Sequence, residues 1–287
     1  MSAGDAILFP GQGSQHDAMR EQVARLDPRL LELATRLVGA DPFEHLADGT
    51  RFVQPAVFCA SVVSWRATRD AVAPIAFAGH SLGEYGALVA AGAVDAADAL
   101  ELVALRGSVS QEVAARREGG MLALLGADDA TAEEIARDCE LAVANDNCPG
   151  QIVLSGPAAG LDAAEAAARE RKIKFARLAV DGPFHSPLME PAADALRAAL
   201  REVRFRPPSR PVFSGVTGRP FDDVPRRLAE SLVTGVRWRA ITHELARLGA
   251  TRLVEVAPGK VLTNLAKRML PDVERVAVER TPIGAAA

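Results

Sequence analysis

The chain has 287 residues, of which 49% are hydrophobic and 24% charged, as expected of a globular protein with a sizeable core. A net charge of -4 and a pI near 5.8 argue against a nucleic-acid or anionic-membrane partner. Three cysteines without metal-ligand spacing are expected to be buried free thiols, and no metal site is expected. With no signal peptide or bilayer-spanning run evident, we expect a cytoplasmic protein.

The first part of the chain alternates short apolar strands with longer helical patterns. The predicted strands are Asp5–Phe9 and Ile75–Gly79, and the predicted helices are Arg29–Val38, Gln54–Val72, Leu82–Ala91 and Ala96–Ala115. Alternation of this kind indicates an α/β fold with a mostly parallel sheet.

The middle of the chain has a different order of elements. It reads strand Met121–Gly126, helix Thr131–Cys139, strand Leu141–Asn145, turn Asn147–Gly150, strand Gln151–Ser155, helix Leu161–Lys172 and strand Phe175–Val180. This β-α-β-β-α-β order is ferredoxin-like. It predicts a small inserted subdomain, residues 119–185, within a larger one formed by residues 1–118 and 186–287.

The α/β pattern resumes after Pro187. The predicted helices are Ala192–Glu202, Val224–Leu232, Trp238–Leu248 and Lys260–Arg268, and the predicted strands are Pro211–Ser214, Arg252–Val256 and Arg275–Val278. The larger subdomain is therefore predicted to resume after the inserted one.

A candidate nucleophile lies between the second strand and the helix that follows it. Gly79-His80-Ser81-Leu82-Gly83 fits G-x-S-x-G in the strand-turn-helix context that a nucleophile elbow requires. The turn would lift the Ser81 hydroxyl above the sheet, and the Leu82 N–H at the helix start could stabilise an oxyanion. Without that context, the same residues would be a glycine-flanked serine capping a helix.

Two further segments support this reading. The glycine-rich turn Phe9–Gln15 also follows a strand, and its amides could supply a second oxyanion donor. His185 lies in a loop between Pro183 and Pro187 and could act as general base to Ser81. Alone, a loop histidine would usually be an ordinary surface residue.

Taken together, these segments resemble malonyl-CoA:acyl-carrier-protein transacylases and the acyltransferase domains of polyketide synthases. The likeness spans about residues 7 to 268 and rests on Phe9–Gln15, Gly79–Tyr85, Arg106-Gly107, Gly120-Met121, Asn145–Gln151, His185-Ser186 and Glu255–Thr263. It implies an α/β-hydrolase-like core with a ferredoxin-like insertion. It also implies ping-pong transfer of malonyl from malonyl-CoA to an acyl carrier protein, with the coenzyme A thioester as substrate and no cofactor.

The resemblance also assigns roles to residues of this chain. It implies Ser81 as nucleophile, His185 as base, and the backbone amides of Gln12 and Leu82 as the oxyanion hole. Arg106 matches the family's carboxylate-binding arginine, since a guanidinium is the best partner for the desolvated malonyl carboxylate. The substrate-binding residues that it implies are Arg106, Gln12, Met121, Asn145 and Phe184.

Other positions refine or complicate the family assignment. At position 184 the sequence resembles malonyl-preferring polyketide acyltransferases in having phenylalanine, although many fatty-acid-pathway relatives carry serine there. Ala257 and Ser110 depart from the family's usual glycine and methionine, and neither is expected to touch the chemistry. The family holds its histidine with a backbone carbonyl, here expected near Leu248, which leaves Asp181 a structural role.

A cluster of basic residues follows the Pro258-Gly259 turn. Lys260, Lys267 and Arg268 are candidates for docking an acidic carrier protein, or are simply solvated cations at a helix end.

Other functions would share part of this pattern. A serine esterase or thioesterase would share the elbow, but it would have its catalytic histidine near the C-terminus, and the only histidine after His185 is His243. The malonyltransferase component of a malonate decarboxylase and a non-catalytic carrier-binding scaffold are further alternatives.

Overall fold

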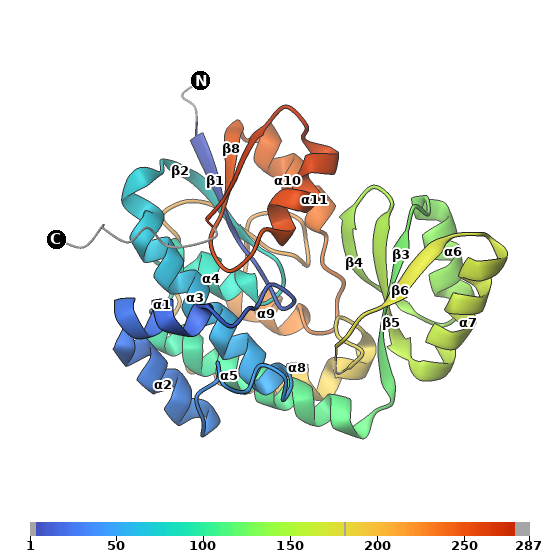
Figure 1. Cartoon of the computed structure of the whole chain (residues 1–287), viewed down its shortest axis with the longest axis horizontal. Helices are drawn as coiled ribbons and strands as arrows, with labels where there is room; N and C mark the ends of the chain where they lie inside the picture. Colours follow the sequence, from blue (N-terminus) through green and yellow to red (C-terminus); the bar gives the residue numbers. More distant parts are fainter. Residues whose placement is uncertain (1–3, 181, 279–287) are drawn as a thin grey trace.

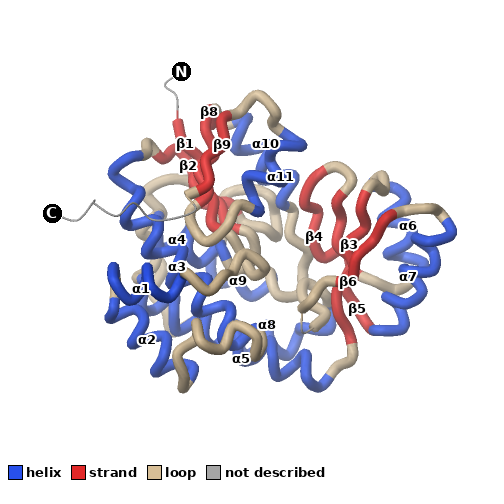
Figure 2. Tube along the Cα trace, in the orientation of Figure 1, coloured by secondary structure: helices blue, strands red, loops and turns tan. Residues whose placement is uncertain are grey.

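The computed structural model describes residues 4–180 and 182–278, so Asp181 lies outside the described residues. Two separate sheets organise the chain, one parallel and one antiparallel, each with helices packed against it (Figures 1 and 2). This confirms the predicted α/β class. Among the described residues, no helix has the length and apolarity that a bilayer crossing requires.

The parallel sheet has the strand order β7-β2-β1-β8-β9. Its strands are β1 (Gly4–Phe9), β2 (Pro74–Gly79), β7 (Val212–Phe213), β8 (Ala250–Glu255) and β9 (Glu274–Ala277). In the central strand β1, Ile7 and Phe9 pack into one hydrophobic cluster and Ala6 and Leu8 into another. Successive residues of a strand point to opposite faces, so both faces of this sheet are covered.

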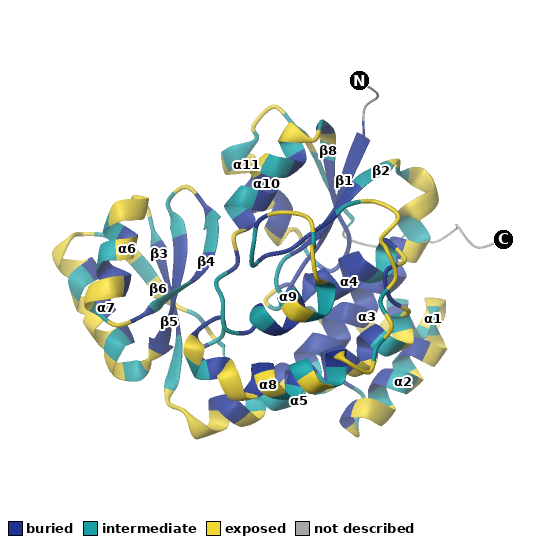
Figure 3. Cartoon of the chain, turned by 180° about the vertical axis from the view of Figure 1, so that it is seen from behind, coloured by how far each residue is buried: buried dark blue, intermediate teal, exposed yellow. Residues whose placement is uncertain are grey.

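The helices around the parallel sheet come from both ends of the chain. They are α1 (Met19–Leu26), α2 (Pro28–Val38), α3 (Thr50–Thr68), α4 (Gly83–Ala90), α5 (Ala96–Arg116), α8 (Glu190–Leu200), α9 (Val224–Glu230), α10 (Trp238–Arg247) and α11 (Val261–Met269), with short 3-10 turns at Arg69–Ala71 and Pro187–Met189. α3 and α4 are largely buried (Figure 3). Helix α1 is not among the predicted helices, because it is short, buries only Met19 and Val23 and has no N-cap side-chain hydrogen bond.

The antiparallel sheet has the order β4-β5-β3-β6. Its elements are β3 (Gly119–Leu125), α6 (Asp129–Asp138), β4 (Ala142–Cys148), β5 (Gln151–Pro157), α7 (Ala158–Glu170) and β6 (Lys174–Arg177). The predicted ferredoxin-like arrangement is therefore confirmed. The predicted turn Asn147–Gly150 was too long, because Cys148 still pairs with Gln151 and only two residues form the turn. Gly150, with a φ of +72°, provides the left-handed conformation that this tight connection needs.

The two faces of the antiparallel sheet differ in what they pack against. On β3, Leu122 and Leu124 pack into a cluster with residues of α6 and α7. Met121 and Ala123 point the other way and pack with Phe184. The strand period of two therefore presents Met121 on the face away from α6 and α7.

The two sheet-bearing parts are joined along β4. The Val236 N–H donates to Ala144 and its carbonyl accepts from the Asp146 N–H, both at 2.9 Å. Arg239 of α10 also pairs with Asp146 and with Asp129 of α6. These contacts fix the antiparallel part against the parallel one and place Asn145, between the two bonded residues, at their junction. The predicted boundaries at residues 118/119 and 185/186 stay a prediction.

Candidate active site

The turn from β2 into α4 has the geometry of a nucleophile elbow. Ser81 has a φ of +52°, in the left-handed region. A Cβ at Gly79 would lie 2.0 Å from the Gly83 carbonyl carbon, and a Cβ at Gly83 would lie 2.1 Å from the Phe9 carbonyl oxygen. Both glycines are therefore required by close backbone approach, and the serine is placed at the start of α4.

The Phe9–Gln15 loop packs directly on the elbow. A Cβ at Gly11 would lie 2.6 Å from the His80 carbonyl oxygen, so glycine lets the two loops touch. Gln12 and Leu82 both line the pocket around Ser81. Neither of their N–H groups donates in the backbone hydrogen bonds of the described turns and loops, which leaves both amides for a ligand oxygen. Their assignment as the oxyanion hole stays a prediction.

His185 lies beside the serine although it is distant in sequence. Its Nε2 is 2.9 Å from Ser81 Oγ, and its Nδ1 is 2.7 Å from the Ser231 carbonyl oxygen. A carbonyl only accepts, so Nδ1 carries the proton and Nε2 is the acceptor for the serine hydroxyl. The loop holds His185 at a φ of +60°, and the ring is buried rather than on the surface.

The carbonyl that holds His185 belongs to Ser231, so the expectation of a carbonyl near Leu248 is wrong. Leu248 instead follows α10 and is 46% exposed. Ser231 is the C-cap of α9, where the last carbonyls of a helix lack intrahelical donors. The helix end thus supplies an acceptor for the imidazole.

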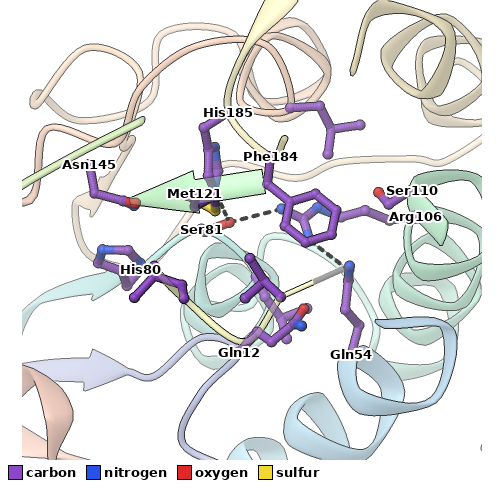
Figure 4. Close-up of a pocket in the computed structure, with 14 residues that line it drawn as sticks. Gln12, Gln54, His80, Ser81, Arg106, Ser110, Met121, Asn145, Phe184 and His185 are labelled. Atoms are coloured by element: carbon purple, nitrogen blue, oxygen red, sulfur yellow. Dashed lines mark hydrogen bonds between the residues drawn. The ribbon is translucent and has the colours of Figure 1, made fainter. Parts of the chain in front are cut away.

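Arg106 of α5 reaches the same serine. Its Nη2 donates to Ser81 Oγ at 2.9 Å and its Nη1 donates to Gln54 Oε1 at 2.5 Å (Figure 4). Gln54 in turn donates to Thr50, and the Thr50 hydroxyl donates to Gln12 Oε1 at 2.7 Å. This chain of hydrogen bonds fixes a guanidinium that is only 5% exposed. Both side chains that accept its hydrogen bonds, Gln54 and Ser81, are neutral, so its charge is available to an anion.

One pocket gathers the predicted site. It is lined by Gln12, Gln54, His80, Ser81, Leu82, Arg106, Ser110, Met121, Asn145, Leu178, Val180, Phe184, His185 and Leu232 (Figure 4). Every catalytic, oxyanion and substrate-binding residue expected from the sequence is among them. Their individual roles stay predictions.

Several lining residues were not foreseen. Gln54 is a buried polar residue within the apolar run of α3, a signal that could have marked it. Leu178, Val180 and Leu232 carried no distinguishing pattern. Ser110, which is not expected to touch the chemistry, also lines the pocket.

The Glu255–Thr263 segment proves to be structural. The buried Glu255 carboxylate accepts from the Leu262 and Thr263 N–H groups at the start of α11. Lys260 precedes that helix, and Lys267 and Arg268 lie exposed in its last turn. Their proposed part in carrier docking is not decided by this placement.

Electrostatics in the pocket favour a neutral base beside a cation. Burial, and then repulsion from Arg106, lowers the pKa of His185 to about 3. The ring is therefore unprotonated near neutral pH and can accept the serine proton. Burial raises the pKa of Glu84 to about 8, although its carboxyl accepts from the Gly215 N–H. Among the described residues, no group of three or more side chains is arranged to hold a metal ion.

An α/β fold that raises a serine on such an elbow beside a neutral histidine is the framework of an enzyme that forms an ester on that serine. The buried guanidinium narrows this class to enzymes acting on an anionic acyl group.

The acyl transferase domain family matches residues 7–281, and the chain belongs to this family. It is 38% identical to the malonyl CoA-acyl carrier protein transacylase of Escherichia coli K12, over 98% of both chains. It is also 38% identical to the polyketide biosynthesis protein ThaF of Burkholderia thailandensis, where the match covers 93% of this chain but 24% of that protein. The crystal structure of malonyl-CoA:acyl carrier protein transacylase from Xanthomonas oryzae superposes with a TM-score of 0.90, at 36% identity, covering 99% and 96% of the two chains.

Proposed function

We propose that this chain transfers a malonyl group from malonyl-CoA to the phosphopantetheine thiol of an acyl carrier protein, in fatty-acid or polyketide synthesis. The observation that carries the proposal is the double contact of Ser81 Oγ, with the base His185 on one side and the cation Arg106 on the other. The likeness to transacylases over nearly the whole chain supports it.

In the first half-reaction, Ser81 Oγ attacks the thioester carbonyl carbon while its proton passes to His185 Nε2. The carbonyl oxygen becomes an oxyanion, held by the N–H groups of Gln12 and Leu82. When the C–S bond breaks, His185 returns the proton to the sulfur of coenzyme A. Malonyl then remains as an ester on Ser81.

In the second half-reaction, the carrier thiol enters the same pocket. His185 Nε2 accepts the thiol proton, and the sulfur attacks the ester carbonyl. The same two amides hold the oxyanion, and the proton returns to Ser81 Oγ as the ester bond breaks. The Ser231 carbonyl holds the histidine in one tautomer throughout, so no carboxylate is needed as third member.

Arg106 supplies the selection for malonyl. A buried charge whose hydrogen bonds go only to neutral groups is unfavourable in the resting chain and is compensated by an entering anion. The free carboxylate of a malonyl group, extending from a thioester at Ser81, provides that anion. Acetyl offers none.

The proposal is tested by intact-protein mass spectrometry after mixing with malonyl-CoA or acetyl-CoA. We expect a stable malonyl adduct that disappears when a phosphopantetheinylated carrier protein is added, with malonyl appearing on the carrier. A serine hydrolase would instead turn over both thioesters and retain little adduct, which would overturn the proposal. Carrier proteins from fatty-acid and polyketide pathways, compared in the second step, identify the acceptor.

We further propose that Lys260, Lys267 and Arg268 help dock the acidic carrier protein. Reversing the charge at the three positions should raise KM for the carrier and leave malonyl-CoA kinetics unchanged. The matched control is reversal of three exposed arginines on other elements, Arg36 of α2, Arg69 of the 3-10 turn after α3, and Arg116 of α5. An unchanged KM for the carrier would contradict the docking assignment alone.

A further inference from the structure

One wall of the pocket holds two buried polar groups without hydrogen-bond partners among the described residues, Arg106 Nε and Ser110 Oγ. Both residues line the pocket and both belong to α5, one helical turn apart (Figure 4). Ser110 is 0% exposed, so its hydroxyl cannot turn to solvent. Burying a donor without an acceptor is unfavourable, and among the described residues that line the pocket only these two carry such a group.

Two of the three nitrogens of the guanidinium donate hydrogen bonds to protein groups. Nη1 donates to Gln54 and Nη2 donates to Ser81 Oγ. The N–H bonds of Nη2 and Nε lie side by side on the same edge of the planar group, and this edge fits the two oxygens of a carboxylate. Once Ser81 carries an acyl ester, its Oγ is a poorer acceptor and Nη2 becomes free as well.

Ser110 lines the same pocket as Arg106, one turn further along α5. Residues four apart on a helix are neighbours on one face, and helical side chains lean toward the N-terminus. The Ser110 side chain therefore leans over the turn that carries Arg106. A carboxylate oxygen bound to Nε would meet the serine hydroxyl as a second donor.

We propose that Ser110 is a specificity-determining residue for the acyl group. Its hydroxyl and the Nε–H of Arg106 together hold one carboxylate oxygen, while Nη2 holds the other. The inference rests on the proposed malonyl transfer and adds a second recognition residue to it. In the resting chain both donors are closed off, so the carboxylate reaches them as Arg106 leaves Ser81.

The test is the Ser110→Ala variant, compared with the wild type in single-turnover acylation by malonyl-CoA and by acetyl-CoA. Losing a hydrogen bond to a charged group should slow malonylation about tenfold or more. Acetylation should be unchanged, because acetyl has no carboxylate to contact the hydroxyl. The melting temperature should not fall, since the substitution removes an unpaired buried hydroxyl. Ser110→Thr, which keeps a hydroxyl, should restore the preference for malonyl.

The matched control is Ser155→Ala. Ser155 on β5 is also 0% exposed and its hydroxyl also lacks a partner among the described residues, but it is not among the residues that line the pocket. This variant should leave both acylation rates unchanged.

A Ser110→Ala variant with the wild-type ratio of malonylation to acetylation would overturn the inference, and so would an equal loss of both rates, which indicates packing alone. Neither result affects the proposed function as long as the wild type forms a malonyl ester. A wild type that forms none would overturn the proposed function and this inference together.

Discussion

The two sides of the acyl pocket are lined by different kinds of side chain, hydrogen-bonded polar groups on one side and mainly apolar groups on the other. On the side of the parallel sheet, Ser81, Arg106 and Gln54 are joined by hydrogen bonds of 2.9 Å or shorter. On the side of the antiparallel sheet, Met121 is apolar and Asn145 is the polar exception. Groups that meet developing charge must be fixed before the reaction, whereas an apolar wall only has to exclude water and fit the acyl chain.

This contrast explains where each side chain comes from. The polar side draws on a strand-to-helix turn, on the largely buried helix α3 and on one buried face of α5, whose positions are determined by packing. The apolar side draws on one face of a strand whose other face binds α6 and α7. Substitutions on the two sides should therefore change different quantities.

The largest effect is expected from Ser81→Ala. Removing the nucleophile leaves no oxygen to carry the acyl group, so transfer should fall by at least about 10⁴-fold. Absence of the malonyl adduct in the intact-protein mass spectrum checks this result. A variant that still transfers malonyl by way of a covalent adduct would place the ester on another residue.

Arg106→Ala should separate the two acyl groups. Malonylation should slow about a hundredfold or more, because the carboxylate would enter the pocket unpaired. Acetylation should change much less, so the preference shifts toward acetyl-CoA. Arg106→Lys keeps the charge without the planar pair of donors, so its malonylation rate should lie between those of the wild type and of Arg106→Ala. If the alanine variant kept wild-type discrimination, Arg106 would not be the carboxylate partner.

Met121→Ala tests the apolar side. Loss of apolar contact should slow acylation by about tenfold or less, and equally for malonyl and acetyl, since the carboxylate that distinguishes malonyl does not meet this side chain. Leu124→Ala on the opposite face of the same strand is the control. It should lower the melting temperature and leave the kinetics of the folded enzyme unchanged. A shift of acyl preference in Met121→Ala would contradict the division of labour between the two sides.

The smallest effect concerns pH and stability. The unfolded chain takes up a proton at His185 below the ordinary pKa of 6.5, whereas the folded chain keeps the ring neutral to about 3. The contribution of this group to the free energy of unfolding is therefore fully present above pH 6.5. It is lost as the pH falls from 6.5 to about 3, by about 1 kcal/mol per pH unit. Denaturant unfolding of wild type and His185→Asn at pH 7 and pH 5 measures the difference. We expect the wild type to lose more free energy of unfolding between pH 7 and pH 5 than the variant. If both lost the same amount, the ring would not be held neutral.

Much of the fold and the core of the site could be predicted from local sequence. Gly79 and Gly83 are required within a few residues of Ser81 by steric limits on one turn, so the elbow has a readable pattern. The ferredoxin-like order followed from the succession of strands and helices. His185 was a candidate base from its loop between two prolines, and the resemblance gave it that role, whereas Arg106 was found through resemblance alone because a lone arginine on a helix has no distinguishing pattern.

Only the tertiary structure decided which groups meet. The Ser231 carbonyl holds His185. Because every residue has a backbone carbonyl, the sequence contains no signal that identifies this one. Ser110 reaches the pocket through the way α5 is rotated against its neighbours, and an isolated serine on a helix does not specify that rotation. Local steric rules act over a few residues and leave a mark in the sequence, whereas contacts between distant segments depend on the packing of the whole chain.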